Sequence, residues 1–238
     1  MNEINSGELL LSENKRSYTV IILYIAIFFM IGMLTFLFFI TLTPIRGESM
    51  ENTVFGGQYC VVQRNGYNIE RGDIVTLNTS EKNEKPNIII KRVIGMSGDN
   101  LLFMLSHDRK TVDLYICGPN DNKFTLCDEP YIKERMTISS NYYNVTVIPY
   151  MDNLDTVTVT DDGLKSDELT AMKLRVIENA MITVPSRHIF FLGDNRNNSR
   201  DSRYYGALSI NTTIGKVLYI PQPNSAMEKF FKLIFLSK

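Results

Sequence analysis

The sequence has 238 residues, which is enough for one sizeable domain with a smaller appendage. It carries 25 Lys and Arg residues against 26 Asp and Glu residues, a formal net charge of -1. Because domains that bind nucleic acid carry a basic excess, this balance argues against polyanion binding, and we expect no nucleic-acid partner.

The first feature along the chain is an apolar segment near the N-terminus. Residues 17–45 contain no charge, and residues 20–42 are almost wholly apolar. About 20 apolar residues suffice to cross a bilayer as a helix, so we expect a transmembrane helix over residues 18–43. A cleaved signal peptide has a shorter apolar region and a small-x-small site, so we favour a retained anchor in contact with membrane lipid.

Charges beside this segment set its expected orientation. Lys15 and Arg16 precede it and only Arg46 follows closely. Because positive charge stays inside, we expect residues 1–17 to be cytoplasmic. The remainder would be an extracytoplasmic domain of a single-pass protein of the cell membrane.

Behind the anchor, short β-branched and aromatic runs alternate with glycine-containing turns. The runs cover residues 59–62, 73–77, 88–94 and 112–116. This pattern predicts an all-β fold, with a catalytic β domain formed by residues 44–135 and 181–223.

Residues 136–180 are polar and rich in Asn and Asp, and we expect them to form a small inserted subdomain. Apolar and charged residues mix at helical spacing over residues 166–179, which predicts a helix there. The tail, residues 224–238, combines aromatic residues with lysines and is too short to span a bilayer. It suits either a contact with the membrane interface or a helix packed on the domain.

The three cysteines form no Cys-x-x-Cys pair, and the chain has only two histidines, so we expect no metal site. In an oxidising exterior, Cys117 and Cys127 could close a loop of about ten residues. Three unpaired thiols are an equal alternative.

Two positions carry the chemistry. Ser49 follows the apolar segment closely, and a serine hydroxyl needs a neighbouring base to become a nucleophile. Lys91 and Arg92 interrupt an apolar strand, and their side chains alternate between its faces, so they must serve different purposes. Burial among isoleucines lowers the pKa of a lysine from about 10.4, and a neutral amine is a competent base. An edge strand with both cations solvated is the alternative.

Several segments together resemble the sequence boxes of bacterial type I signal peptidases, in the same order along the chain. They are Ser49-Met50 after an apolar span, residues 71–75 (Arg-Gly-Asp-Ile-Val), residues 91–99 (Lys-Arg-Val-Ile-Gly to Gly-Asp), residues 127–134, and the polar loop 193–206. The likeness covers most of the chain outside residues 136–180.

This resemblance implies a Ser-Lys dyad on an all-β fold, with Ser49 as nucleophile, Lys91 as general base and no cofactor. It further implies that Ser199 orients the lysine amine. Ion pairs between Arg92 and Asp194 and between Asp201 and Arg203 would hold the site. The Ser49 amide would bind the oxyanion.

By the same resemblance, the substrates are exported preproteins whose signal peptide ends in a small-x-small site. An extended peptide would add to the strands of the site, and the expected pocket residues are Ile45, Met50, Val54, Ile89 and Ile90. Plain core packing is the alternative for each of them.

Two residues depart from the family pattern. Gly47 has no hydroxyl for the oxyanion, and Asn52 stands where the family commonly has proline. Asn52 leaves open a catalytically idle membrane adaptor that binds exported peptides or pilins. A soluble Ser-Lys autoprotease of the repressor type is disfavoured by the apolar segment, and a histidine-using relative by Lys91.

Overall fold

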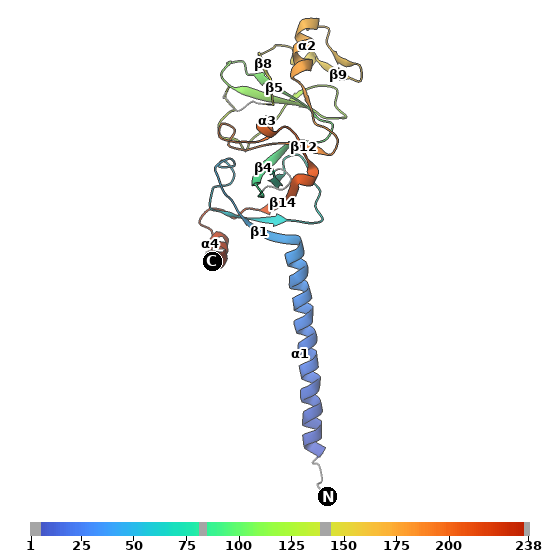
Figure 1. The fold of residues 1–238 in the computed structure, drawn as a ribbon, viewed down its shortest axis with the longest axis vertical. Helices are drawn as coiled ribbons and strands as arrows, with labels where there is room; N and C mark the ends of the chain where they lie inside the picture. The colour runs from blue at the N-terminus through green and yellow to red at the C-terminus, as the bar shows by residue number, and fades with distance from the viewer. Residues whose placement is uncertain (1–5, 81–84, 139–143, 236–238) are drawn as a thin grey trace.

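The computed structural model describes residues 6–80, 85–138 and 144–235. One long N-terminal helix leads into a mainly β domain, and the two are arranged end to end (Figure 1). The helices are α1 (Ser6–Phe39), α2 (Ala171–Ala180), α3 (Ser202–Tyr205) and α4 (Ala226–Phe235), with short 3-10 turns η1 (Leu154–Thr156) and η2 (Ile210–Thr212). Beyond α1, most of the regular structure is β-strand and the helices are short, so the prediction of a mainly β domain is confirmed.

Helix α1 contains a 22-residue apolar segment, Tyr18–Phe39, that is long enough to cross a membrane. No part of its most apolar window is buried against the rest of the protein, so it is not a core helix. The helix was expected to continue to residue 43, and this is wrong for its last four residues. Ile40 to Pro44 instead form strand β1, because their backbone pairs with β2 in the register Ile40 to Gln63 through Pro44 to Tyr59.

A seven-stranded sheet forms the half of the domain next to α1. Its strands run in the order β1 (Ile40–Pro44), β2 (Tyr59–Gln63), β14 (Thr213–Tyr219), β3 (Ile74–Asn78), β4 (Ile88–Gly95), β12 (His188–Leu192) and β13 (Leu208–Ser209). All of these pairings are antiparallel. Strand β4 is interior, since β3 lies on one side and β12 on the other, so the alternative of an edge strand with two solvated cations is wrong.

The distal half is built on a five-stranded sheet. It has the order β11 (Ile182–Thr183), β5 (Asn100–Leu105), β6 (Val112–Cys117) and β7 (Thr125–Leu126), with β8 (Val147–Ile148) parallel to β5. Strand β5 is buried on both faces. Leu101 and Phe103 pack toward Phe190 of the large sheet, whereas Leu102 and Met104 pack toward Ile177 of α2.

Residues 136–180 form the layer that packs against the Leu102 and Met104 face of β5. They contain β8, the hairpin of β9 (Thr158–Thr160) and β10 (Gly163–Lys165), and α2. The segment shares its hydrophobic core with β5 instead of forming a separate one. Helix α2 begins at Ala171, five residues later than expected, because Thr170 is its N-cap and accepts a hydrogen bond from the Lys173 amide at 3.4 Å.

All three cysteines are free thiols. Cys60 is buried in β2, and burial raises the pKa of its thiol to about 11. Cys117 is also buried, and its thiol donates to the Asp121 carbonyl at 3.4 Å. Cys117 and Cys127 therefore do not form the disulfide that was one of the two alternatives.

Candidate active site

Ser49 and Lys91 meet at the interior strand β4 of the large sheet. Ser49 lies in the turn that follows β1, and Lys91 extends from the interior strand β4. The Lys91 Nζ and Ser49 Oγ are 2.5 Å apart, and Nζ also donates to the Ile90 carbonyl at 2.9 Å. Residues 42 positions apart in sequence are thus within hydrogen-bonding distance, as a nucleophile and its base require.

Lys91 is only 2% exposed. Burial is the main reason that its pKa falls from the ordinary value to about 8, since the charged form loses hydration. The carboxylates of Asp201 and Asp194 act in the opposite direction, and Arg203 lowers the pKa further. A large fraction of Lys91 is therefore neutral near pH 8, and a neutral amine can accept the Ser49 proton.

Arg92 leaves β4 beside Lys91 but binds a different partner. Its Nε donates to Asp194 Oδ1 at 2.9 Å and its Nη2 to Asp194 Oδ2 at 2.6 Å, while Nη1 donates to the Gly72 carbonyl at 2.8 Å. Asp194 is fully buried. This two-bond ion pair fixes the start of the polar loop 193–206 against β4.

Asp201 and Arg203 form a second buried ion pair, with nitrogen-to-oxygen distances of 2.9 and 2.8 Å. Asp201 Oδ2 also accepts from the Gly193 amide at 3.0 Å, and Asp201 is the N-cap of α3. Burial alone would raise the pKa of Asp201, but Arg203 and the Gly193 amide outweigh it, so the pKa is lowered. The expected pairing is present, and it ties the end of the loop to its beginning.

Ser199 lies inside this loop and is 5% exposed. Its hydroxyl helps to lower the pKa of Asp201, but it has no hydrogen-bond partner of good geometry in the described part of the chain. A Cβ on Gly193 would overlap both Ser199 Oγ and the Ser49 carbonyl oxygen. Gly193 therefore allows the polar loop to approach closely the turn that carries Ser49, the expected nucleophile; we call this the nucleophile turn.

Asn52 supports the nucleophile turn in a way that the sequence did not indicate. Its Nδ2 donates to the Asp194 carbonyl at 2.8 Å, and the neighbouring Thr53 hydroxyl bonds to the Asp194 carboxylate. The Asn195 amide donates to the Ser49 carbonyl at 3.1 Å. Side-chain and backbone hydrogen bonds thus hold this turn where a proline would have stiffened it.

Three residues near the site were missed by the sequence analysis. Glu129 forms a two-bond ion pair with the buried Arg196 of the polar loop. Tyr131 lies under Arg92, whose guanidinium carbon is 4.0 Å from the ring centroid. The charges within the 127–134 segment and the polar loop were the available signal, but their pairing depends on a contact between distant segments.

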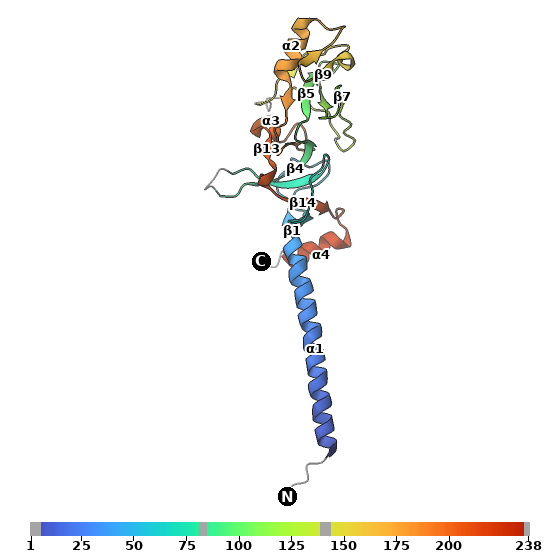
Figure 2. The same cartoon turned by 90° about the vertical axis from the view of Figure 1, so that its right-hand side faces the viewer.

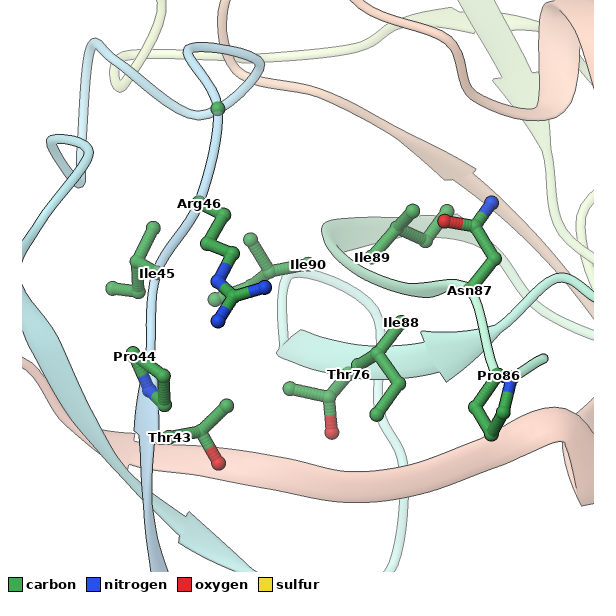
Figure 3. Close-up of a pocket in the computed structure, with 11 residues that line it drawn as sticks. Thr43, Pro44, Ile45, Arg46, Thr76, Pro86, Asn87, Ile88, Ile89 and Ile90 are labelled. Atoms are coloured by element: carbon green, nitrogen blue, oxygen red, sulfur yellow. The ribbon is translucent and has the colours of Figure 1, made fainter. Parts of the chain in front are cut away.

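A cavity of about 640 Å³ opens next to the dyad. Two segments line it, Thr43 to Gly47 on one side and Pro86 to Ile90 on the other, with Thr76 at its base (Figure 3). Of the expected pocket residues, Ile45, Ile89 and Ile90 are among those that line it. Met50 and Val54 do not line it. They are 1% and 0% exposed and pack in one core cluster with Ile45 and Ile90.

With this geometry established, comparison with known proteins assigns the family. The family described as "Signal peptidase, peptidase S26" matches residues 16–220. The chain belongs to the signal peptidase family. The signal peptidase I of Bacillus caldolyticus is 31% identical over 176 residues, which cover 73% of this chain and 74% of that protein.

The chain is also similar to a second curated signal peptidase and to a solved structure. The signal peptidase IB of Staphylococcus aureus (strain N315) is 26% identical over 88% of this chain and 92% of its own length. A crystal structure of signal peptidase I from Enterococcus faecalis V583 is 26% identical, covers 64% of this chain and 98% of that chain, and superposes with a TM-score of 0.34. The family match and the Bacillus caldolyticus relative identify the present chain as a peptidase of the signal peptidase I kind.

Proposed function

We propose that this protein removes signal peptides from exported preproteins with Ser49 as nucleophile and Lys91 as general base, while α1 anchors it in the membrane. The observation that carries the proposal is the 2.5 Å contact between Ser49 Oγ and a buried lysine amine. Family membership supports signal-peptide removal, and the dyad and the anchor are our assignment.

In the first half of the reaction, neutral Lys91 takes the proton of Ser49 as Oγ attacks the scissile carbonyl carbon. The Ser49 amide makes no hydrogen bond to the described residues and is available to stabilise the oxyanion. The Lys91 ammonium then protonates the leaving amine as the peptide bond breaks. The mature protein departs, and the signal peptide remains esterified to Ser49.

In the second half, Lys91 is neutral again and removes a proton from a water molecule that attacks the ester. The ester bond breaks, the proton returns to Ser49 Oγ, and the signal peptide leaves with a new carboxylate. We assign Ser199 the role of positioning the amine, because its buried hydroxyl makes no hydrogen bond of good geometry to the described residues and so retains hydrogen-bonding capacity.

The cavity suits an extended peptide. Strand β1 is an edge strand of its sheet. Strand β12 pairs with β4 only over Arg92 to Gly95, so one backbone edge of Ile88 to Ile90 has no partner strand among the described residues. A substrate strand can hydrogen-bond to such edges. Ile45 and Ile90 narrow the cavity between them, which favours small side chains in the substrate (Figure 3).

The anchor places this chemistry at a membrane surface. Ser49 lies ten residues after Phe39, the last residue of the apolar segment of α1. Signal peptides are themselves apolar and membrane-seeking, so a peptidase held at the same surface meets them at high local concentration.

Mass spectrometry of a preprotein with a small-x-small site, after incubation with the detergent-solubilised full chain, tests the proposal. We expect a single new N-terminus after that site, and no product with Ser49→Ala. Absence of a product with the parent chain, although both chains are folded, would favour the idle adaptor. The hydrogen bond from Asn52 to the Asp194 carbonyl supports the peptidase over the adaptor, because it holds the turn of Ser49 without the proline.

A further inference from the structure

Helix α4 carries an exposed row of large apolar side chains. Met227, Phe230 and Leu233 are 46%, 54% and 76% exposed. Residues three apart lie along one side of a helix, so the three form a continuous strip. Phe231 and Glu228 point elsewhere and are buried against the domain. One side of α4 thus packs on the protein while a second apolar side has no partner in the described chain.

The fold does not require this strip to be apolar. Ser225 and Glu228 form a capping box at the start of α4, in which the Glu228 amide donates to Ser225 Oγ at 3.2 Å and the Asn224 amide to Glu228 Oε2 at 2.6 Å. Lys232 pairs with Glu228 at 3.0 Å. These local bonds and buried Phe231 hold the helix without a contribution from the apolar strip, which leaves the strip available for a contact outside the chain.

The position of α4 indicates what that contact is. Two perpendicular views place α4 beside β1, at the level where α1 ends, and Figure 2 shows it running across the direction of α1. Lys232 of α4 lines a cavity together with Pro44 to Gly47, which confirms that the two segments are neighbours. Because the apolar segment of α1 ends at Phe39, this level corresponds to the boundary of the bilayer.

We propose that α4 is a second membrane contact, with its apolar strip in the interface of the lipid bilayer and Lys229 directed to lipid phosphates. An amphipathic helix that lies in the membrane plane buries its apolar side at the boundary between headgroups and acyl chains. Two contacts, α1 and α4, prevent the domain from turning about the α1 axis. The cavity beside Ser49 then keeps a fixed height above the bilayer. The proposal rests on the anchoring role of α1 but not on the dyad.

The sequence contains no tryptophan, so single Trp variants of the full chain report local environments without background. Phe230→Trp probes α4 and Phe28→Trp probes the middle of α1. Met172→Trp is the matched control, since Met172 is 78% exposed on α2 at the far end of the domain (Figure 1). Each variant is reconstituted into phospholipid vesicles, with and without brominated acyl chains, and Trp emission is recorded. The bromine is placed near the headgroup to probe position 230 and near the chain end to probe position 28, and position 172 is measured with both lipids.

We expect brominated lipid to remove about half or more of the emission of Trp at 230, because interfacial helices insert their apolar side about 5–10 Å. Trp at 172 should keep its emission. Quenching at 28 but none at 230 overturns the proposal while leaving the anchor intact. A blue-shifted but unquenched signal at 230 also overturns it and indicates a second copy of the chain on this strip. No quenching at 28 would refute the anchor itself, and this proposal with it.

Discussion

Lys91 and Arg92 are adjacent in β4, but their charged groups lie in separate environments, Lys91 against Ser49 and Arg92 against Asp194. The alternation of side chains along the strand separates them. Lys91 is desolvated and has no directly bonded carboxylate, so its pKa falls. Arg92 is neutralised by its two-bond ion pair with Asp194. Two adjacent basic residues are thus placed for two purposes, Lys91 for the proposed role of base and Arg92 for a structural ion pair.

The pH dependence of cleavage follows from the lowered pKa of Lys91. Protonated Lys91 cannot accept the Ser49 proton, so the rate should rise with pH through a midpoint at about 8 and fall about tenfold per pH unit below it. Initial rates on a peptide substrate between neutral and alkaline pH check this. His188→Ala is the control, and an acidic limb near the histidine range that vanishes in that variant would contradict the lysine mechanism.

Lys91 should also reduce the stability of the fold. Its folded-state pKa lies below the unfolded one, so the unfolded chain holds an extra proton between about pH 8 and 10.5, and stability rises with pH in that window. We therefore expect Lys91→Met to be more stable than the parent at neutral pH by roughly 3 kcal/mol, with no cleavage. The difference should shrink toward pH 10.5. Thermal melts across this range provide the measurement, and a margin independent of pH would be inconsistent with burial of the charge.

Removing one partner of the Arg92–Asp194 pair should chiefly destabilise the domain. Asp194→Ala leaves the Arg92 cation, whose side chain is 11% exposed, without its carboxylate, and such a loss costs about 3–5 kcal/mol. Denaturant unfolding measures it. If Arg92→Ala unfolds like the parent yet no longer cleaves, Arg92 has a catalytic role, and its assignment as a purely structural residue is wrong.

Gly193→Ala should abolish cleavage, because its Cβ would push Ser199 and the Ser49 carbonyl away from their positions. Gly56→Ala is a matched control in the nucleophile region, since its Cβ would meet only the Gly47 carbonyl at 3.4 Å. We expect Gly56→Ala to retain most activity. Comparable rates for the two variants would mean that the close approach at Gly193 is not needed for catalysis.

Two N-terminal truncations distinguish the contribution of helix α1 from that of strand β1. Deletion of residues 1–37 should leave a domain that still cleaves peptides, because Phe38 and β1 remain, and the Asn65 amide keeps its 2.8 Å bond to the Phe38 carbonyl. Deletion of residues 1–43 removes most of β1, including Thr43 of the cavity lining, so the segment Pro44 to Gly47 loses the strand that positions it. It should lose most peptide cleavage. Equal peptide activity of the two truncated chains would show that β1 does not shape the substrate site.

The sequence by itself determined the features that depend on local pattern. The length of the apolar segment marked α1, the short β-branched runs marked β2, β3, β4 and β6, and two cations in an apolar strand marked Lys91 and Arg92. The order of the motifs then gave the family, and with it Ser49, Ser199 and the two ion pairs. These features can be predicted because periodicity and composition act within a few residues.

Only the tertiary structure decided what depends on contacts between distant segments. Strand β1 takes over from the helix at Ile40 because β2 offers a pairing edge, which no local pattern in an apolar run can indicate. The bond from Asn52 to Asp194 joins residues 142 positions apart, and the stacking of Tyr131 on Arg92 depends on the same folding. Ile45, Met50 and Val54 pack in one core cluster, but only Ile45 also lines the cavity, because the path of the turn after β1 sets which of these residues adjoins it.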